Sequence, residues 1–377
     1  MNQKVDQLME QAIERGIFPA ASLLVGRGGG EMLHEGYYGK ARAGTVFDIA
    51  SLTKPISTAT LAMQLIQEGL VKLEDSVYQW LGGARLGHHK KMTLAHLLSH
   101  TSGLPAWQPF YRELPIDQVG TKEGKQHIIG SCLKEPVVTE PGFQCLYSDL
   151  GYIILGEILE QAGLASLDIL FQNRIATPLG LKDTFFNRVI GFSPESRVPS
   201  PESRKRFAPT EDCPWRGHVL HGEVHDQNAY AMGGVAGHAG LFSTARDIHK
   251  FITEFLKCYR GESDWLSPKI VRQFIDDPSR ATSNACPPAV WREQRATFGT
   301  YLLGWDTPTF GSSSSGRYFS PHSIGHLGYT GCSIWIDLDK NFWIILLTNR
   351  IHPETTNEKI RAFRPRIHDL CWKELME

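Results

Sequence analysis

The chain has 377 residues, with 39 basic and 40 acidic side chains and a formal net charge of -1 at pH 7. This length is enough to bury a sizeable core and to form two lobes, and the balanced charge argues against a polyanion-binding surface, so nucleic acid is not an expected partner. The seven cysteines are scattered and form no C-x-x-C pair, which argues against a disulfide framework and against a zinc knuckle.

The N-terminal segment has the pattern of an amphipathic helix and lacks the apolar h-region of a signal peptide. No other run of residues approaches the ~20 apolar residues that a membrane span needs. We therefore expect a cytoplasmic protein without a membrane span. A secreted protein whose signal peptide has been removed is the alternative.

Both ends of the chain predict β-hairpins. The strand-like segments ASLLVG (21–26) and EMLHEGYYG (31–39) flank the turn RGGG, and CSIWIDL (332–338) and FWIILLT (342–348) flank DKN. A helical pattern closes the chain, and Pro365 should kink this helix or delay its start.

Mostly helical patterns and long loops rich in Gly and Pro lie between these ends. We therefore expect an α+β fold whose central, mainly antiparallel sheet comes from both termini and is flanked by helices. The sheet lobe would comprise residues 1–75 and 296–377, and a helix-rich lobe carrying the active-site loops would be inserted as residues 76–295.

The stretch FDIASLTKP (47–55) places a serine and a lysine three residues apart. Pro55 fits a helix only in its first turn, so Ser51 should lie at a helix start. Apolar residues at positions 56, 59, 62, 63 and 66 predict a buried face, and Gly69 is a plausible end. Ser51 and Lys54 would then lie on one face of the helix, one turn apart.

These two side chains suit nucleophilic catalysis. A serine hydroxyl is a weak nucleophile at neutral pH unless a base removes its proton, and burial can lower the pKa of a lysine enough to help. A backbone N–H at a helix start can also stabilise an oxyanion. The alternative is that Ser51 only caps the helix and Lys54 lies at the surface, because S-x-x-K is common by chance.

Two further motifs follow in order, YSDLGY (147–152) and HLGYTG (326–331). With them the chain resembles the serine penicillin-recognising superfamily, which includes class C β-lactamases, D-alanyl-D-alanine carboxypeptidases, D-aminopeptidases and related esterases. Their shared pattern is S-x-x-K, then Y-x-N, then K-T-G or H-x-G. Other segments look like family landmarks in family order: LLSHTSGLP (97–105), GGVAGHAGLFSTARD (233–247), LGW (303–305) and LTNRIHP (347–353).

The resemblance implies a role for each matching residue. Ser51 would be the acylated nucleophile, Lys54 its proton partner and Tyr147 the general base of acylation. The remaining matches would line the site, and the backbone N–H groups of Ser51 and Tyr329 would form the oxyanion hole. The residues that would line the substrate site are Asp149, His326, Gly328 and Arg350.

Two residues differ from the commoner residues of the family pattern. Asp149 stands where Asn is common, and if ionised it would hold Lys54 as an ammonium and shift the base role to a Tyr147 phenolate. His326 stands where Lys often supplies a fixed positive charge for a substrate carboxylate, and histidine is mostly neutral at pH 7. We therefore expect neutral esters or amides, rather than penicillins, to be the better substrates, unless Arg350 supplies the missing charge.

The segment 213–240 is rich in histidine and holds His218, His221, His225, Asp226 and His238. A metal site is one interpretation, but the segment has no H-E-x-x-H and no helical register for ligands. The others are a lid-like loop beside the pocket and simple hydrogen bonding within the loop. We expect no metal and no cofactor.

The sequence therefore predicts a serine hydrolase that forms an acyl-enzyme on Ser51 with a small ester, amide or peptide-like substrate, β-lactams included. The alternative is a non-enzymatic protein of the same fold that binds or senses a small molecule.

Overall fold

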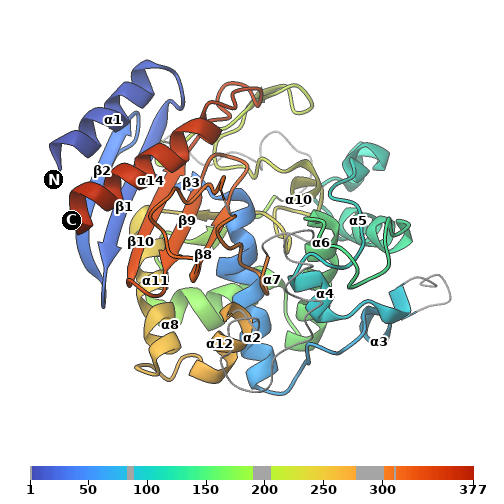
Figure 1. The fold of residues 1–377 in the computed structure, drawn as a ribbon. Helices are drawn as coiled ribbons and strands as arrows, with labels where there is room; N and C mark the ends of the chain where they lie inside the picture. The colour runs from blue at the N-terminus through green and yellow to red at the C-terminus, as the bar shows by residue number, and fades with distance from the viewer. Residues whose placement is uncertain (1, 83–88, 190–204, 277–300, 310) are drawn as a thin grey trace.

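The computed structural model describes residues 2–82, 89–189, 205–276, 301–309 and 311–377. Its centre is a five-stranded antiparallel sheet in the order β2-β1-β10-β9-β8, so strands from both ends of the chain lie side by side (Figure 1). The strands are β1 (Ala20–Arg27), β2 (Glu31–Gly39), β8 (Ser323–Leu327), β9 (Ser333–Asp337) and β10 (Phe342–Thr348). Both expected hairpins are confirmed. The lobe boundary expected at residues 295 and 296 lies outside the described residues.

The two faces of the sheet bury different cores, which is why β10 is apolar at nearly every position. Along this strand Ile344 and Leu346 face the terminal helices α1 (Gln3–Glu14) and α14 (Ile360–Met376). The alternate residues, including Ile345, pack into the larger core with helix α11 (Ala245–Arg260). A strand covered on both faces reads as a continuous apolar run.

Helix α14 is not delayed by its proline. It begins at Ile360 and runs through Pro365, because buried residues on both sides of the proline, such as Phe363 and Ile367, pack against the sheet. Tertiary packing thus outweighs the lost backbone hydrogen bond, a local cost that sequence reasoning weighs more heavily.

The segment that carries Ser51 and Lys54 starts a buried helix, as expected. A 3-10 turn at Ala50–Leu52 leads into a π-helical turn at Lys54–Ala59 and then into α2 (Thr60–Gln67). Pro55 lies in the first turn of this helical stretch, and Gly69 follows the helix with a φ of 73°. The start signal, Pro55, and the stop signal, Gly69, were therefore both correct.

Other helices and short strands surround this segment. The helices are α3 (Val77–Leu81), α4 (Leu94–Leu98), α5 (Lys122–Lys134), α6 (Asp149–Gly163), α7 (Leu167–Phe171), α8 (Thr177–Leu179), α10 (Gln227–Ala231) and α12 (Pro268–Ile275). The short strands are β3 (Phe47–Asp48), β4 (Phe185–Phe186), β5 (Asp212–Cys213), β6 (His218–Val219) and β7 (Leu241–Ser243). The expected α+β architecture is confirmed.

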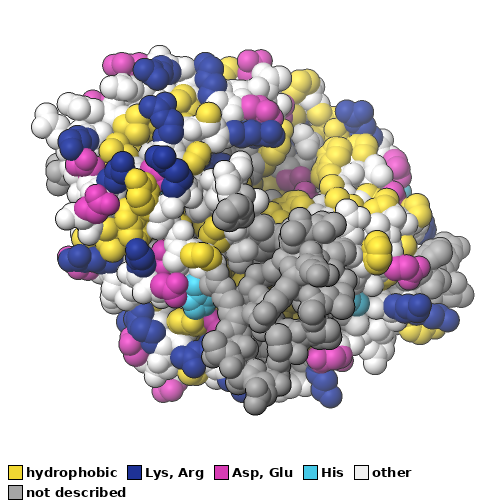
Figure 2. All heavy atoms as spheres, viewed as in Figure 1, with side chains coloured by type: hydrophobic (Ala, Val, Ile, Leu, Met, Phe, Trp, Pro, Cys, Tyr) yellow, Lys and Arg dark blue, Asp and Glu magenta, His cyan; other side chains and the backbone are white. Residues whose placement is uncertain are grey.

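The surface shown in Figure 2 carries Lys and Arg side chains interleaved with Asp and Glu. Among the helices that the structure describes, none combines the length and the apolar character needed to cross a bilayer.

Candidate active site

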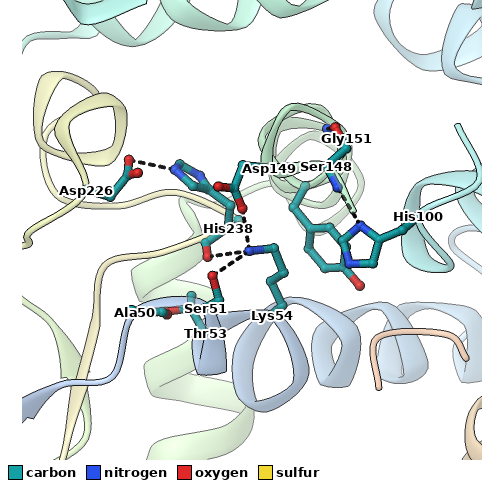
Figure 3. A network of polar contacts seen from close by, with 12 residues as sticks. Ala50, Ser51, Thr53, Lys54, His100, Ser148, Asp149, Gly151, Asp226 and His238 are labelled. Atoms are coloured by element: carbon teal, nitrogen blue, oxygen red, sulfur yellow. Dashed lines mark hydrogen bonds and ion pairs between the residues drawn. The ribbon is translucent and has the colours of Figure 1, made fainter. Parts of the chain in front are cut away.

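Ser51, Lys54 and Asp149 lie in direct contact (Figure 3). Lys54 Nζ donates to Ser51 Oγ at 2.9 Å, to Asp149 Oδ1 at 2.6 Å and to the His238 carbonyl at 3.1 Å. The Lys54 side chain is 0% exposed, whereas that of Asp149 is 19% exposed. The sequence spacing therefore brings the serine and lysine together, and α6 adds the carboxylate.

The turn before Ser51 is held in a strained conformation. Ala50 has a φ of 47°, a region that L-amino acids rarely adopt, and such strain is common at functional sites. Asp48 fixes the turn, because its Oδ1 accepts from the Ala50 N–H at 2.8 Å and its Oδ2 from the His225 N–H at 2.7 Å. The turn thus presents Ser51 at a fixed angle.

Tyr147 is held by His100, a residue that the sequence analysis passed over. The His100 carbonyl accepts from the Leu146 N–H at 2.8 Å, and His100 Nδ1 accepts from the Ser148 N–H at 3.0 Å. The two rings lie 4.3 Å apart between centroids. Burial, and then the charge of Lys54, lowers the pKa of His100 well below its usual value, which keeps its ring neutral and able to accept.

Burial acts in opposite directions on the ionisation of Lys54 and Tyr147. It lowers the pKa of Lys54, while the Asp149 carboxylate opposes that shift. It raises the pKa of Tyr147 well above its usual value, helped by the charge of Asp149 and opposed by a hydrogen bond to Ser51. The Tyr147 phenol is therefore protonated at neutral pH. This argues against the Tyr147 phenolate expected from the sequence, because desolvation of the ring outweighs its proximity to Lys54.

The turn after β8 lies against the nucleophile segment. A Cβ added at Gly328 would lie 2.6 Å from the Ile49 carbonyl oxygen, so only glycine fits there. Thr330 Oγ1 donates to the Asp48 carbonyl at 2.8 Å, which fastens the other end of the turn. The structure therefore brings Gly328 and Tyr329 to the same site as Ser51.

His326 occupies a different position from the one expected. It is 2% exposed, its Nδ1 interacts with the Leu327 carbonyl at 2.9 Å, and its ring lies about 6 Å from the rings of Tyr147 and Tyr301. Burial, and then the charge of Lys54, lowers its pKa to about 3. The imidazole is therefore neutral, as expected, but it packs within the wall, and β8 presents Leu327 to the cleft.

Arg350 borders the cleft with most of its donors already engaged. Its Nε donates to the Tyr329 carbonyl at 2.9 Å, and its Nη1 to the carbonyls of Thr355 and Asn357 at 2.9 and 2.8 Å. It is 7% exposed, with its guanidinium 4.7 Å from the centroid of the Tyr329 ring. Arg350 thus braces the turn that follows β8.

These groups surround one cleft of about 660 Å³. Ser51 and Asp149 line it together with acidic, aromatic and basic residues from several loops and helices. Its charged lining residues are Asp149, Glu211, Asp226, Arg350, Arg361 and Arg364. Burial lowers the pKa of Arg364 to about 10, and its Nε has no hydrogen-bond partner within the described part of the chain.

The histidine-rich segment borders this cleft through His225, Asp226 and His238. Its histidines have separate partners: His218 contacts Glu223 at 2.8 Å, His225 contacts Glu211 at 3.1 Å and His238 contacts Asp226 at 2.8 Å. Over the described residues, no three His, Cys, Asp or Glu side chains are grouped closely enough to hold a metal.

We expect ester hydrolysis to survive dialysis against a chelator, because the contacts at Ser51 need only side chains. Initial rates before and after dialysis, with and without added zinc, measure this. A loss of activity that zinc restores would instead indicate ligands in the histidine-rich segment.

Comparison with known proteins agrees with this geometry. A D-alanyl-D-alanine carboxypeptidase by name, from Salmonella paratyphi A, is 32% identical over 342 residues, which cover 85% of this chain and 73% of that protein. Among solved structures, the octameric penicillin-binding protein homologue of Pyrococcus abyssi has a TM-score of 0.69 at 19% identity, covering 99% of this chain and 78% of that one. Simvastatin synthase of Aspergillus terreus, unliganded, has a TM-score of 0.67 at 20% identity, covering 99% and 98%.

At such low identities the TM-scores show a shared fold alone. The expected β-lactamase/transpeptidase-like fold is thereby confirmed. The Beta-lactamase family model matches residues 3–365, nearly the whole chain. The chain therefore belongs to the beta-lactamase family of serine hydrolases.

Proposed function

We propose that the protein hydrolyses small esters, amides or peptide-like substrates through an acyl-enzyme on Ser51. The observation that carries this proposal is the 2.9 Å contact between Lys54 Nζ and Ser51 Oγ. Ser51 lines the cleft, and the buried Lys54 is also paired with Asp149. An intact nucleophile beside a desolvated base is what acyl transfer requires.

In the first step Ser51 Oγ attacks the carbonyl carbon of the substrate, and the serine proton moves to a Lys54 amine that has first lost its ammonium proton, a loss that burial favours and Asp149 opposes. Lys54 rather than Tyr147 takes this proton, because burial lowers the pKa of the lysine and raises that of the phenol. Asp149 then stabilises the ammonium that forms. The protonated Tyr147 donates its proton to the leaving group as the carbonyl–leaving-group bond breaks, and Lys54 returns a proton to Tyr147.

The backbone N–H groups of Ser51 and Tyr329 serve as the oxyanion hole in this proposal. The fixed turn at Ala50 and the close fit of Gly328 against Ile49 support it, because each constrains the backbone next to one of the two residues. Water then attacks the acyl carbon and gives up one proton to Lys54. The bond between the acyl carbon and Ser51 Oγ breaks, so that the acyl group leaves as a carboxylic acid. Lys54 passes its proton to Ser51 Oγ, which restores the hydroxyl.

Intact mass after reaction with a fluorophosphonate or a labelled penicillin tests this function. We expect one adduct per chain, and the decay of a penicillin adduct reports its lifetime. Protein that binds penicillin but stays unmodified by either reagent would favour the alternative, a ligand-binding protein without catalysis.

Among substrates, we expect short neutral esters such as p-nitrophenyl acetate to react faster at about pH 7 to 8 than penicillins, because His326 is neutral. A second candidate is a peptide with a terminal carboxylate. The arginines that line the cleft favour it, and the carboxypeptidase name of the Salmonella relative agrees with it.

Arg361→Ala should therefore lower the reactivity with penicillin roughly threefold to tenfold while leaving that with p-nitrophenyl acetate unchanged, since only penicillin carries a carboxylate to pair with. Arg361 lines the cleft, and its side chain is 75% exposed. Arg366→Ala, an exposed position on the same helix, is the matched control. An equal fall for both reagents would argue against a carboxylate subsite at Arg361.

A further inference from the structure

We propose that Asp226 and His238 form a positioning pair that holds Lys54 in place for reaction with Ser51. Neither residue belongs to the Ser51, Lys54 and Tyr147 set, and the inference rests on the function proposed above. His238 acts through its backbone, and Asp226 acts through the His238 ring.

The backbone around His238 is fastened to the nucleophile helix at three points. The His238 carbonyl accepts from Lys54 Nζ at 3.1 Å, and the adjacent Gly237 carbonyl accepts from Thr58 Oγ1 at 2.6 Å. Thr53 Oγ1 accepts from the Leu241 N–H at 3.1 Å. Lys54 and Thr58 are four residues apart, so one face of the helix meets two successive carbonyls.

Helix α6 presses on the same segment from the other side. A Cβ added at Gly237 would lie 2.1 Å from the Tyr152 carbonyl oxygen, and one added at Gly156 would lie 3.1 Å from Gly237 Cα. Residues 237 and 238 are therefore wedged between the helix that carries Lys54 and the helix that carries Asp149. A small rotation of His238 would move the carbonyl that Lys54 contacts.

Asp226 fixes the orientation of the His238 ring (Figure 3). The ring is 1% exposed, and its Nε2 lies 2.8 Å from Asp226 Oδ1. Asp226 itself caps α10 by accepting from the Ala229 N–H at 2.7 Å. His238 Nδ1 has no hydrogen-bond partner among the residues that the structure describes. Asp226 therefore fixes the orientation of the His238 ring, and through the ring it fixes the position of the His238 carbonyl.

Asp226 also contributes a charge near Lys54. The ionisable groups that face the ammonium are Asp149, Asp226, His100, His326, Tyr147 and Tyr152. Both carboxylates raise the pKa of Lys54 against the effect of burial, Asp149 more than Asp226. Loss of the Asp226 charge should thus lower the pKa of Lys54 and leave its contact with Asp149 intact.

Two variants of Asp226 separate these effects. Asp226→Asn keeps an oxygen that can accept from His238 Nε2 and removes only the charge, whereas Asp226→Ala removes both. Glu223→Gln is the matched control, because it removes a carboxylate from the His218 pair of the same segment, away from the cleft lining. The readout is the rate of Ser51 labelling by a fluorophosphonate, resolved into the maximal rate kinact and the concentration constant KI, from acid to alkaline pH.

Labelling rises with pH as Lys54 loses its proton, so a lower pKa moves this rise to lower pH. We expect that displacement for Asp226→Asn, with kinact on the plateau and KI close to those of the parent protein. For Asp226→Ala we expect kinact to fall roughly ten- to a hundredfold with KI within about twofold, as a misplaced base would produce. Glu223→Gln should leave both constants and the pH profile unchanged.

A kinact for Asp226→Ala within about twofold of the parent, or an equal fall for Glu223→Gln, would overturn the proposal, and a profile for Asp226→Asn that coincides with the parent would remove the charge contribution of Asp226 from it. If Asp226→Ala does not fold, Asp226→Ser takes its place with the same expected fall in kinact, because serine can still cap α10 but is too short to reach the His238 ring. Parent protein that takes no label on Ser51 at any pH would instead refute the proposed function, so the two failures are distinguishable.

Discussion

Protein carrying Ser51→Ala should take up no fluorophosphonate and no penicillin, and its turnover of p-nitrophenyl acetate should fall by roughly 10⁴-fold or more. The reason is that the covalent bond forms to Ser51 Oγ, which lines the cleft and lies 2.9 Å from Nζ of the buried Lys54. Intact mass of the variant after exposure to each reagent measures the labelling, and a progress curve measures the turnover.

The thermal midpoint of Ser51→Ala should stay close to that of the parent, because the lost hydroxyl borders the cleft and bonds only to Lys54 and Tyr147, and a net hydrogen bond contributes only about 1 kcal/mol. Ser57→Ala is a matched control on the same helix, since Ser57 is fully buried, and it should label as the parent does. An undiminished adduct on Ser51→Ala would move the nucleophile to Ser99 or Ser102. That would be surprising, because Ser102 is 1% exposed and Ser99 Oγ is engaged with Ala95 and Thr101.

Local patterns were sufficient to predict the parts of the fold that they encode. The two hairpins follow from alternating and apolar runs around Gly-rich or polar turns, and the nucleophile helix follows from the positions of Pro55 and Gly69. These signals act over a few residues, so they survive without knowledge of the tertiary structure. The continuation of α14 through Pro365 depends on packing against a sheet, which local preference does not contain.

The candidate site divides in the same way. Ser51 and Lys54 could be paired from their spacing, whereas His100 contacts Tyr147 from 47 positions away and has no signal of its own beyond its place in LLSHTSGLP. The burial of His326 and the engagement of Arg350 by three carbonyls are also products of the folded chain. Sequence reasoning therefore identified His326 and Arg350 but not what they contact, and it missed His100.

Lys54→Met should lower the rate of Ser51 labelling by roughly 10² to 10⁴-fold, the range that a positioned base supplies. It should also destabilise the fold by about 3 kcal/mol, near the lower end for a broken buried pair, because Asp149 is 19% exposed and can be partly hydrated from the cleft. Labelling kinetics and denaturant unfolding measure the two effects separately.

The double variant Lys54→Met with Asp149→Asn tests whether the charge pair stabilises the fold independently of its chemistry. Removing one charge leaves the other buried and unpaired, whereas removing both leaves a neutral amide beside an apolar chain of similar length. We therefore expect the double variant to recover at least about 1 kcal/mol relative to the sum of the single variants, measured by a double-mutant cycle in urea. Its labelling should stay as slow as that of Lys54→Met, because no base is restored at Ser51. Additive losses of stability would show that Lys54 and Asp149 do not act as a pair, and recovered labelling would show that Lys54 is not the base.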